Sequence, residues 1–234
     1  MHRRLAIAAL LLSAAASAGA ATYTVTSTAD SGAGTLRQAI LDANASPGAD
    51  TIAFNVLGSG VQTIAPAASL PPITEAVTID GYTQPGASPN TQSVGHGLDT
   101  VLRIALDGAN AAGPGLDVRA PSVVIRGLAI HGFSQFQIRA DSGSNHANLV
   151  VEGCFLGTSP DGLSGQSGTG AIDASDPGLR IGGLTPGARN LVGPTPGARS
   201  RSRGTPRASS RATSSGPTPR ASARSDPWSP TSRA

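Results

Sequence analysis

A short unit recurs along the middle of the chain at a nearly constant spacing. Ile125-Arg126-Gly127-Leu128-Ala129-Ile130 returns 26 residues later as Val151-Glu152-Gly153-Cys154-Phe155-Leu156, and Ile79-Asp80-Gly81 returns 27 residues later as Leu106-Asp107-Gly108. A fixed period of this length is typical of proteins that stack supersecondary units. The apolar residues of each unit can point inward, and the glycine permits a backbone bend that a flat strand cannot make.

This pattern predicts an all-β fold, a right-handed parallel β-helix whose coils span residues 58–192. Aromatic residues make up only 3% of the chain, so the core must use small and β-branched side chains in a repeating way. An antiparallel sandwich also uses short strands and turns and is the alternative, but the recurring spacing favours coils over hairpins. The expected inward-facing residues are Val123, Ile125, Ile130, Phe133, Ile138, Val151, Phe155 and Leu156.

Residues 21–57 are expected to cover one end of the stack. Residues 22–28 alternate and are rich in threonine, so they predict a strand, and residues 51–54 predict another. Between them, Thr35-Leu36-Arg37-Gln38 is a capping box, in which the hydroxyl of Thr35 and the side chain of Gln38 can bond the first free N–H groups of a helix. The predicted helix ends near Asn44, and its apolar face consists of Leu36, Ala39, Ile40 and Ala43.

Several of these stretches resemble the signatures of a protein family. Residues 34–40 resemble the "CSLREA" motif of secreted bacterial β-helix proteins, and residues 78–86, 153–158 and 181–190 resemble other recurring signatures of that family. The resemblance covers roughly residues 22–192 and implies a pectin-lyase-like right-handed β-helix, but it implies no particular activity. The chain departs from the family in lacking the motif's cysteine, in having Gln38 for the usual glutamate, and in having Cys154 where the repeat normally has asparagine.

The N-terminus predicts export. Arg3 and Arg4 precede an apolar run, and small residues then lead to Ala18-Gly19-Ala20, so residues 1–20 read as a Sec-type signal peptide cleaved after Ala20. The apolar run is too short to span a bilayer, and no later stretch is a candidate span. We therefore predict a secreted or cell-surface protein with no membrane span after cleavage. Its single cysteine excludes an intrachain disulfide framework.

The positive net charge of +3 is unevenly distributed. Residues 21–194 contain seven arginines and thirteen acidic residues, whereas residues 195–234 contain eight arginines and one acidic residue, Asp226. The basic residues thus belong to the signal region and the tail, while the predicted folded part is acidic. This distribution argues against nucleic-acid binding.

Residues 193–234 have almost no apolar residues and are rich in Arg, Ser, Pro, Thr, Ala and Gly. One interpretation is a disordered basic tail. We favour another, a β-helix coil translated out of frame from near residue 192. Shifting the reading frame by one base permits Gly-Asn-Phe-Ile-Gly-Thr-Asp across residues 211–218, which is close to residues 153–159. This interpretation predicts a truncated chain with a frayed C-terminal edge and low solubility.

Four charged residues are the candidate catalytic site. Asp80, Asp107, Arg126 and Glu152 occupy equivalent repeat positions, so we expect them to stack in one column on an outer face. Enzymes that cleave polysaccharides need paired acid–base groups or a charge-stabilising cation, and such a column could supply them. The alternative is a solvated ladder of charges with no chemical role.

Other polar residues predict structural roles. Either His131 or His146 could be a general base, but both are expected in surface turns. Asp161 is expected in a turn, and Cys154 as a small packed residue. The sequence contains no metal-ligand spacing, nucleophile elbow or phosphate-binding loop, so no cofactor or metal is predicted.

Three functional hypotheses remain open. The first is a non-enzymatic secreted or surface protein that binds extracellular polysaccharide or acts as an adhesin, because extended solenoid surfaces suit elongated ligands. The second is a polysaccharide lyase or glycoside hydrolase. The third is a truncated fragment without function. The sequence does not indicate an oligomeric state.

Overall fold

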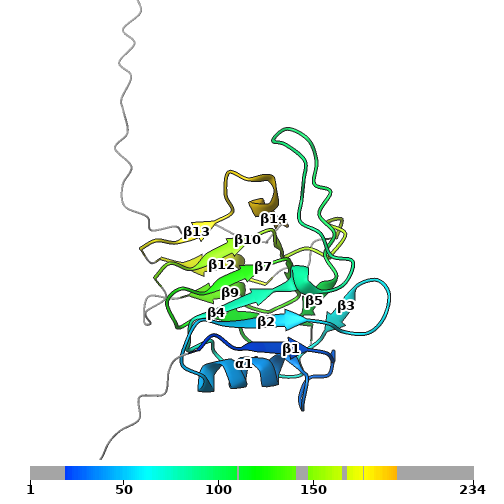
Figure 1. The fold of residues 1–234 in the computed structure, drawn as a ribbon. Helices are drawn as coiled ribbons and strands as arrows, with labels where there is room; N and C mark the ends of the chain where they lie inside the picture. Colours follow the sequence, from blue (N-terminus) through cyan, green and yellow to red (C-terminus); the bar gives the residue numbers. More distant parts are fainter. Residues whose placement is uncertain (1–18, 110, 141–146, 165–167, 176, 194–234) are drawn as a thin grey trace, which may run out of the picture. The chain divides into compact units, whose positions relative to one another are not determined.

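Three parallel sheets make up most of the described chain (Figure 1). The computed structural model describes residues 19–109, 111–140, 147–164, 168–175 and 177–193. They belong to the first of two compact units, Met1–Gly204, while the second, Thr205–Ala234, lies outside the described residues. The predicted signal peptide up to residue 18 and the predicted tail from residue 194 also lie outside them.

The sheets have six, five and three strands. The six-stranded sheet has the order β1 (Thr22–Val25), β2 (Asp50–Phe54), β4 (Val77–Asp80), β7 (Val124–Arg126), β10 (Val150–Glu152) and β13 (Arg180–Ile181). The five-stranded sheet has the order β14 (Leu191–Val192), β11 (Phe155–Leu156), β8 (Leu128–His131), β5 (Ile104–Asp107) and β3 (Gln62–Ile64). The three-stranded sheet consists of β12 (Gly170–Ala174), β9 (Phe136–Ala140) and β6 (Leu116–Asp117). All pairings between these strands are parallel, which contradicts the antiparallel sandwich.

Successive strands visit the three sheets in turn. The strands β4, β5 and β6 lie one in each sheet, and β7 to β9 and β10 to β12 repeat that order. We call one such passage a circuit. Ile125 lies opposite Val151, as the 26-residue repeat predicts, but Ile79 lies opposite Ile125, 46 residues further on. That circuit is longer because it contains an extra segment, residues 84–103, which we call the strap.

The core lies between the sheets and is built from stacked aliphatic side chains. Ile52, Ile79, Ile125 and Val151 lie opposite one another in adjacent strands, and each is 0% exposed. Burying one such side chain stabilises the fold by about 1.5–3 kcal/mol, so the column is a large part of the stability. All eight predicted core residues are buried. Phe155, however, belongs to a second cluster, described below.

The predicted helix forms as α1 (Leu36–Ala45), and its predicted apolar face is buried. It contacts β1 and β2 at one end of the six-stranded sheet (Figure 1). The Thr35 hydroxyl caps it by accepting a hydrogen bond from the Gln38 N–H at 3.3 Å. The predicted hydrogen bond from the Gln38 side chain back to the start of the helix is wrong, because this side chain donates to Asp42 instead. The Thr35 N–H does not need it, since it already donates to the Gly32 carbonyl.

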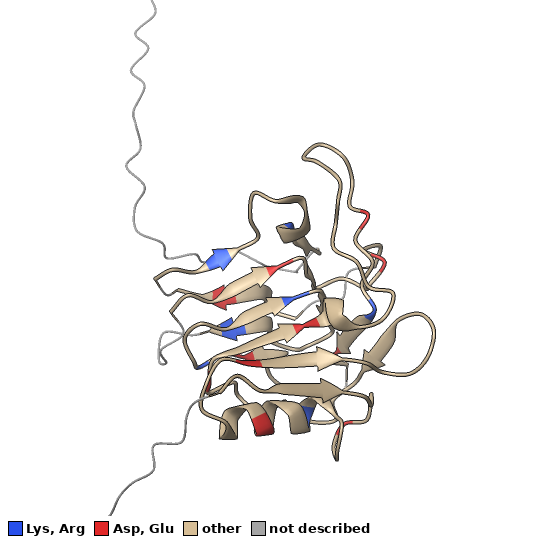
Figure 2. Cartoon of the chain, viewed as in Figure 1, with Lys and Arg blue, Asp and Glu red and all other residues tan. Residues whose placement is uncertain are grey.

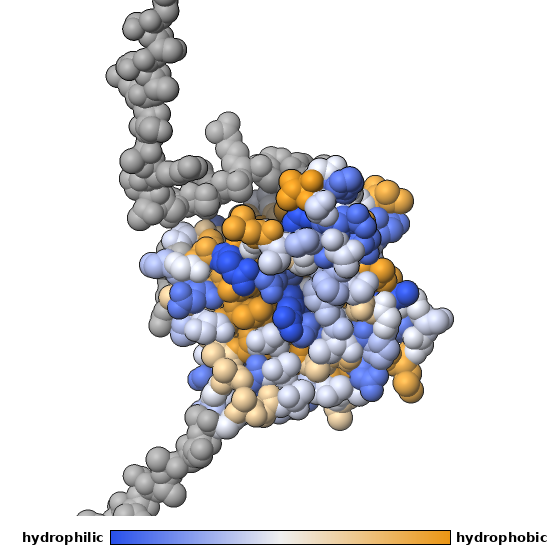
Figure 3. Space-filling view, turned by 45° about the horizontal axis from the view of Figure 1, so that its top comes forward, coloured by the Kyte–Doolittle hydropathy of each residue, from blue (hydrophilic) through white to orange (hydrophobic). Residues whose placement is uncertain are grey.

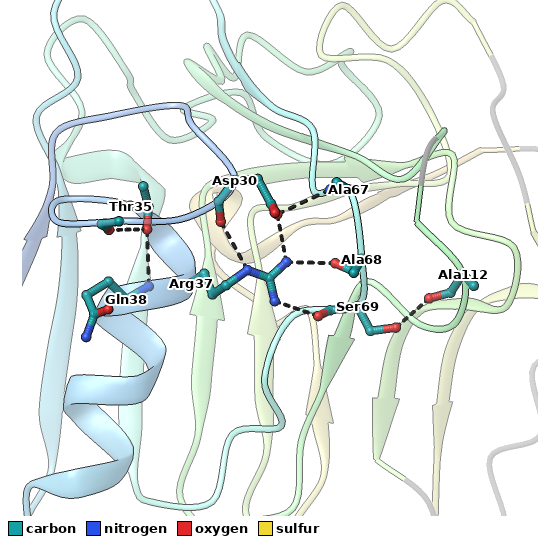
Figure 4. Close-up of polar contacts among 9 residues, drawn as sticks. Asp30, Thr35, Arg37, Gln38, Ala67, Ala68, Ser69 and Ala112 are labelled. Atoms are coloured by element: carbon teal, nitrogen blue, oxygen red, sulfur yellow. Dashed lines mark hydrogen bonds and ion pairs between the residues drawn. The ribbon is translucent and has the colours of Figure 1, made fainter.

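Arg37, the arginine of the CSLREA-like motif, ties α1 to the loop before β4 (Figure 4). Its guanidinium donates to the Asp30 carboxylate at 2.7 Å, and to the carbonyls of Ala68 and Ser69 at 2.8 and 2.7 Å. The hydrogen bond from Arg37 is the main reason why the pKa of Asp30 is lowered. The motif therefore has a structural role here, which sequence reasoning did not assign.

Candidate functional site

Charged residues alternate in sign across four strands of the six-stranded sheet, red and blue in Figure 2. Asp80, Arg126 and Glu152 lie opposite one another at the ends of β4, β7 and β10. Arg126 Nη2 lies 2.7 Å from Asp80 Oδ2, and Arg180 Nη1, from β13, lies 2.8 Å from Glu152 Oε2. We call these four residues the charge ladder. The predicted stacking of Asp80, Arg126 and Glu152 is thus confirmed.

The carboxylates of the charge ladder form ion pairs with its arginines. Asp80 is 9% exposed at its side chain and also accepts a hydrogen bond from the Tyr82 N–H. The hydrogen bond to Asp80, with Asp80 and Glu152 both nearby, raises the pKa of Arg126 further above its usual value. Each carboxylate therefore has a guanidinium partner, and the two carboxylates belong to β4 and β10, with Arg126 of β7 between them.

Asp107 does not lie in this column, so that part of the prediction is wrong. It ends β5 in the five-stranded sheet, where it lies opposite His131 of β8. The 27-residue spacing from Asp80 compares two strands of one circuit, β4 and β5, and not one strand position in two circuits. The true counterpart of Asp80 is Arg126, beyond the strap.

Asp107 and His131 form a separate pair. His131 Nδ1 lies 3.8 Å from Asp107 Oδ1 and has no hydrogen-bond partner although it is buried. His131 is 8% exposed and ends a strand, so its predicted place in a surface turn is wrong. Burial lowers the pKa of His131, and the carboxylate of Asp107 opposes that shift only in part. His146 lies outside the described residues.

A second group of paired charges, on the three-stranded sheet, escaped the sequence analysis. Asp117 of β6 lies opposite Arg139 of β9 and accepts from it at 2.9 and 3.1 Å. It also binds Arg119 at 2.6 Å. Burial alone would raise the pKa of Asp117, but hydrogen bonds from Arg139 and Arg119 lower it overall. The 22-residue spacing of Asp117 and Arg139 differs from the repeat, so no periodic signal pointed to it.

The strap covers the outer face of the five-stranded sheet. Its Leu98 and Leu102 pack with Ala105, Ala129 and Phe155. Phe155 is therefore buried under the strap and not among the stacked side chains between the sheets, because its neighbour Leu156 takes the inward position. The strap is closed by an antiparallel bridge between Ser88 and Val101. Hydrogen bonds from Thr91 and Gln92 lower the pKa of Asp99, another strap residue, to about 2.

Long-range contacts tie the strap to the last turn of the described chain. Asn90 Nδ2 donates to the carbonyl of Pro186, in the short 3₁₀ helix η2 (Pro186–Ala188), at 3.0 Å. Arg189 donates to the carbonyls of His96 and Gly97.

Tyr82, in the 3₁₀ helix η1 (Gly81–Thr83), donates to the Gly153 carbonyl at 2.8 Å. Burial raises the pKa of Tyr82 well above its usual value.

The position of Tyr82 explains the repeated glycine. Gly127 and Gly153 have φ of +70° and +60°, which side chains rarely adopt, so the predicted backbone bend is confirmed there. A Cβ on Gly127 would also lie 2.8 Å from the ring of Tyr82, and one on Gly153 would lie 2.3 Å from its hydroxyl. The two glycines thus leave space for one aromatic side chain that spans two circuits.

Two smaller predictions are confirmed. Asp161 Oδ1 accepts hydrogen bonds from the Ser159 hydroxyl and the Leu163 N–H, the pattern of a turn. Cys154 is 0% exposed and packed in the core. Burial raises the pKa of its thiol to about 12, so hardly any reactive thiolate exists at neutral pH.

Within the described ranges, no group of three or more His, Cys, Asp or Glu side chains could hold a metal ion. In the same ranges, no helix has the length and apolar character needed to cross a membrane. No protein-family model matches the chain, and no curated protein matches it significantly.

Proposed function

We propose that the chain is an exported right-handed parallel β-helix without catalytic activity, which presents the outer face of its six-stranded sheet to extracellular polysaccharide. The solenoid assignment is supported by strands that visit three parallel sheets in a fixed order and pair with their counterparts of the next circuit. Connections between parallel strands of one sheet are almost always right-handed, which supports the hand. The export assignment rests on the signal-peptide pattern of residues 1–20.

The observation that carries the binding proposal is the charge ladder. It runs across four adjacent strands, which in any sheet lie about 4.8 Å apart, a spacing of the order of one sugar unit. Beside it, the half-buried Val124 and Val150 lie opposite each other in β7 and β10. Figure 3 shows apolar and hydrophilic surface side by side on this face. Sugars have C–H faces that can pack on the apolar surface and hydroxyl groups that can hydrogen-bond the hydrophilic surface.

The pairing of the ladder favours binding over catalysis. Glycoside hydrolases use two carboxyl groups about 5–9.5 Å apart, one of which must exchange a proton with the substrate. Here Asp80 and Glu152 are each held by an arginine, and Asp107 lies in another sheet. A lyase or hydrolase remains the alternative function, and it would have to break these ion pairs when substrate binds.

Affinity electrophoresis of the mature chain in gels that contain neutral or acidic polysaccharides tests the binding proposal. We expect Arg180→Ala to weaken retardation at least tenfold. Arg119→Ala is the matched control, because Arg119 is equally exposed (48% against 50%) and equally paired with a carboxylate, but lies outside the ladder. Absence of retardation by every polysaccharide, or equal effects of both substitutions, would overturn the proposal.

An assay for unsaturated uronates and reducing ends on the same polysaccharides tests the enzymatic alternative. We expect no turnover. Turnover that disappears in Glu152→Gln but persists in Arg119→Ala would establish the lyase or hydrolase instead.

The third hypothesis, a fragment truncated by a frameshift, is supported by the apolar residues at the last strands. Ile181 and Val192 are 45% and 53% exposed, although they continue inward-facing columns. Sequencing the DNA across codons 188–198 and past the stop codon tests this hypothesis. A second open frame that encodes further coils would support truncation, and a closed frame would establish the basic tail as genuine.

A further inference from the structure

Asp50, the first residue of β2, has a buried and only partly satisfied carboxylate. The residue is 1% exposed, and its Oδ1 accepts a hydrogen bond from the backbone nitrogen of Ala21 at 2.7 Å. Its Oδ2 is buried and has no hydrogen-bond partner among the residues that the structure describes. A buried carboxylate with a single neutral donor is poorly compensated for its lost hydration.

The sheet fixes the nitrogen of Ala21 at this carboxylate. Ala21 directly precedes β1, and its carbonyl accepts a hydrogen bond from the Thr51 N–H at 2.8 Å. The next residue, Thr22, lies opposite Thr51 in the parallel pairing of β1 with β2. Gly19 and Ala20, just before it, are exposed. The bond between Ala20 and Ala21 thus joins an exposed segment to a strand with a fixed position.

We propose that Asp50 is the binding site for the α-ammonium group of Ala21, created when a peptidase of the export machinery cleaves the bond between Ala20 and Ala21. The proposal rests on the export assignment, whose predicted cleavage point is this bond. Hydrolysis consumes one water: the C–N bond breaks, Ala20 keeps a new carboxylate, and the nitrogen of Ala21 takes up protons. An α-amino group has a pKa of about 7.7–8.0, so it is an ammonium at neutral pH.

The ammonium group suits the site better than the amide does. A peptide nitrogen has one hydrogen, which already bonds Oδ1, whereas an ammonium has three and can also donate to the unpartnered Oδ2. Its positive charge compensates the buried carboxylate, and charge-assisted hydrogen bonds are roughly twice as strong as neutral ones. Cleavage would therefore stabilise the fold at the strand that begins the six-stranded sheet.

The test compares two forms of the chain. One begins at Ala21 with a free amino group, released from a fusion partner by a protease that leaves no extra residue, and the other keeps Gly19 and Ala20. At pH 6.5, we expect the unfolding equilibrium constant of the free form to be at least tenfold smaller. The advantage should vanish in Asp50→Asn and persist in the control Asp42→Asn, whose carboxylate accepts a hydrogen bond from Gln38 on α1, away from Ala21.

The pH dependence gives a second readout. Pairing with Asp50 raises the pKa of the ammonium in the folded state, so its contribution is complete below about pH 7.7 and is lost as pH rises through the raised value. Equal stability of the two forms, or an advantage that survives in Asp50→Asn, overturns the proposal. Since the two-form comparison uses the unsubstituted chain, it stays decisive even if Asp50→Asn does not fold.

Mass spectrometry of the protein exported by a bacterial host locates the cleaved bond separately. A mature terminus at Ala21 supports the proposal, and a terminus at another residue overturns it. Neither result depends on polysaccharide binding, so a failure of the binding proposal is distinguishable from a failure here.

Discussion

Cys154 and Asn190 occupy the same position in consecutive circuits, one residue before β11 and β14. The Asn190 side chain accepts from the Cys154 N–H at 2.8 Å and donates to the Val151 carbonyl at 2.9 Å. The Cys154 thiol lies 3.6 Å from the carbonyl of Ile125, the residue opposite Val151. The Cys154 thiol thus takes the place, relative to Ile125, that the Asn190 amide takes relative to Val151 in the next circuit.

We therefore predict that Cys154→Asn is tolerated. The new amide can bond the Ile125 carbonyl as Asn190 bonds that of Val151, so the free energy of unfolding should stay within about 1 kcal/mol of the unsubstituted protein. Cys154→Val, which fills the space without a hydrogen bond, should be less stable than Cys154→Asn by about 1 kcal/mol. Urea unfolding of the three proteins measures this order, and a more stable valine variant would contradict it.

His131 shows what a sequence conceals at this scale. The sequence predicts a surface turn at His131. Only the three-dimensional structure shows that it lies next to Asp107 with its Nδ1 buried. Because the folded protein lowers the pKa of His131, the unfolded chain binds the proton more tightly. Acid should therefore destabilise the fold through this residue.

The expected result is a loss of stability as pH falls through about 6.5 toward the lowered pKa of His131. One proton limits the slope to about 1.4 kcal/mol per pH unit. The slope should disappear in His131→Gln and remain in His96→Gln, a substitution in the exposed part of the strap. Unfolding curves from pH 7.5 to 5.5 measure it, and an unchanged slope in His131→Gln would exclude this histidine as its source.

At the scale of elements, the helix was predictable because its signals are local. A threonine cap and an apolar face at helical spacing lie within ten residues and need no distant partner. The strands around Ile125 and Val151 were predictable because their spacing repeats. The strap was not predictable, since its sequence has no repeat and its position depends on contacts with η2 and the five-stranded sheet. Its length also caused the wrong placement of Asp107.

The helix cap gives a direct test of the corrected capping box. Thr35→Ala should lower the free energy of unfolding by about 1 kcal/mol, because the Gln38 N–H loses its acceptor. Gln38→Ala should change it by less than about 0.5 kcal/mol, since that side chain bonds only Asp42. Chemical denaturation of both variants measures the free energy of unfolding. Equal losses in the two variants would mean that the reciprocal capping box predicted from the sequence does form.

At the scale of the molecule, the first and the last strands of the two larger sheets differ in how they are covered. At one end α1 covers the first strands with four buried apolar residues. At the other end, β13 and β14 pair on one side only among the described strands, and Ile181 and Val192 leave their columns partly in solvent. Exposed apolar edges of this kind invite pairing with another chain. The strap braces this end through Asn90 and Arg189 but does not cover those two residues.

We therefore predict that the protein associates with itself through this edge as its concentration rises. The double substitution Ile181→Lys and Val192→Lys should suppress association while costing less than about 1 kcal/mol of stability, because both side chains are already about half exposed. Leu57→Lys is the control, since Leu57 is 88% exposed and lies between β2 and β3, near the end that α1 covers. Sedimentation velocity over a concentration series measures the effect. A monomer at all concentrations, or equal suppression by Leu57→Lys, would mean that the edge is already protected in solution, which would count against truncation as well.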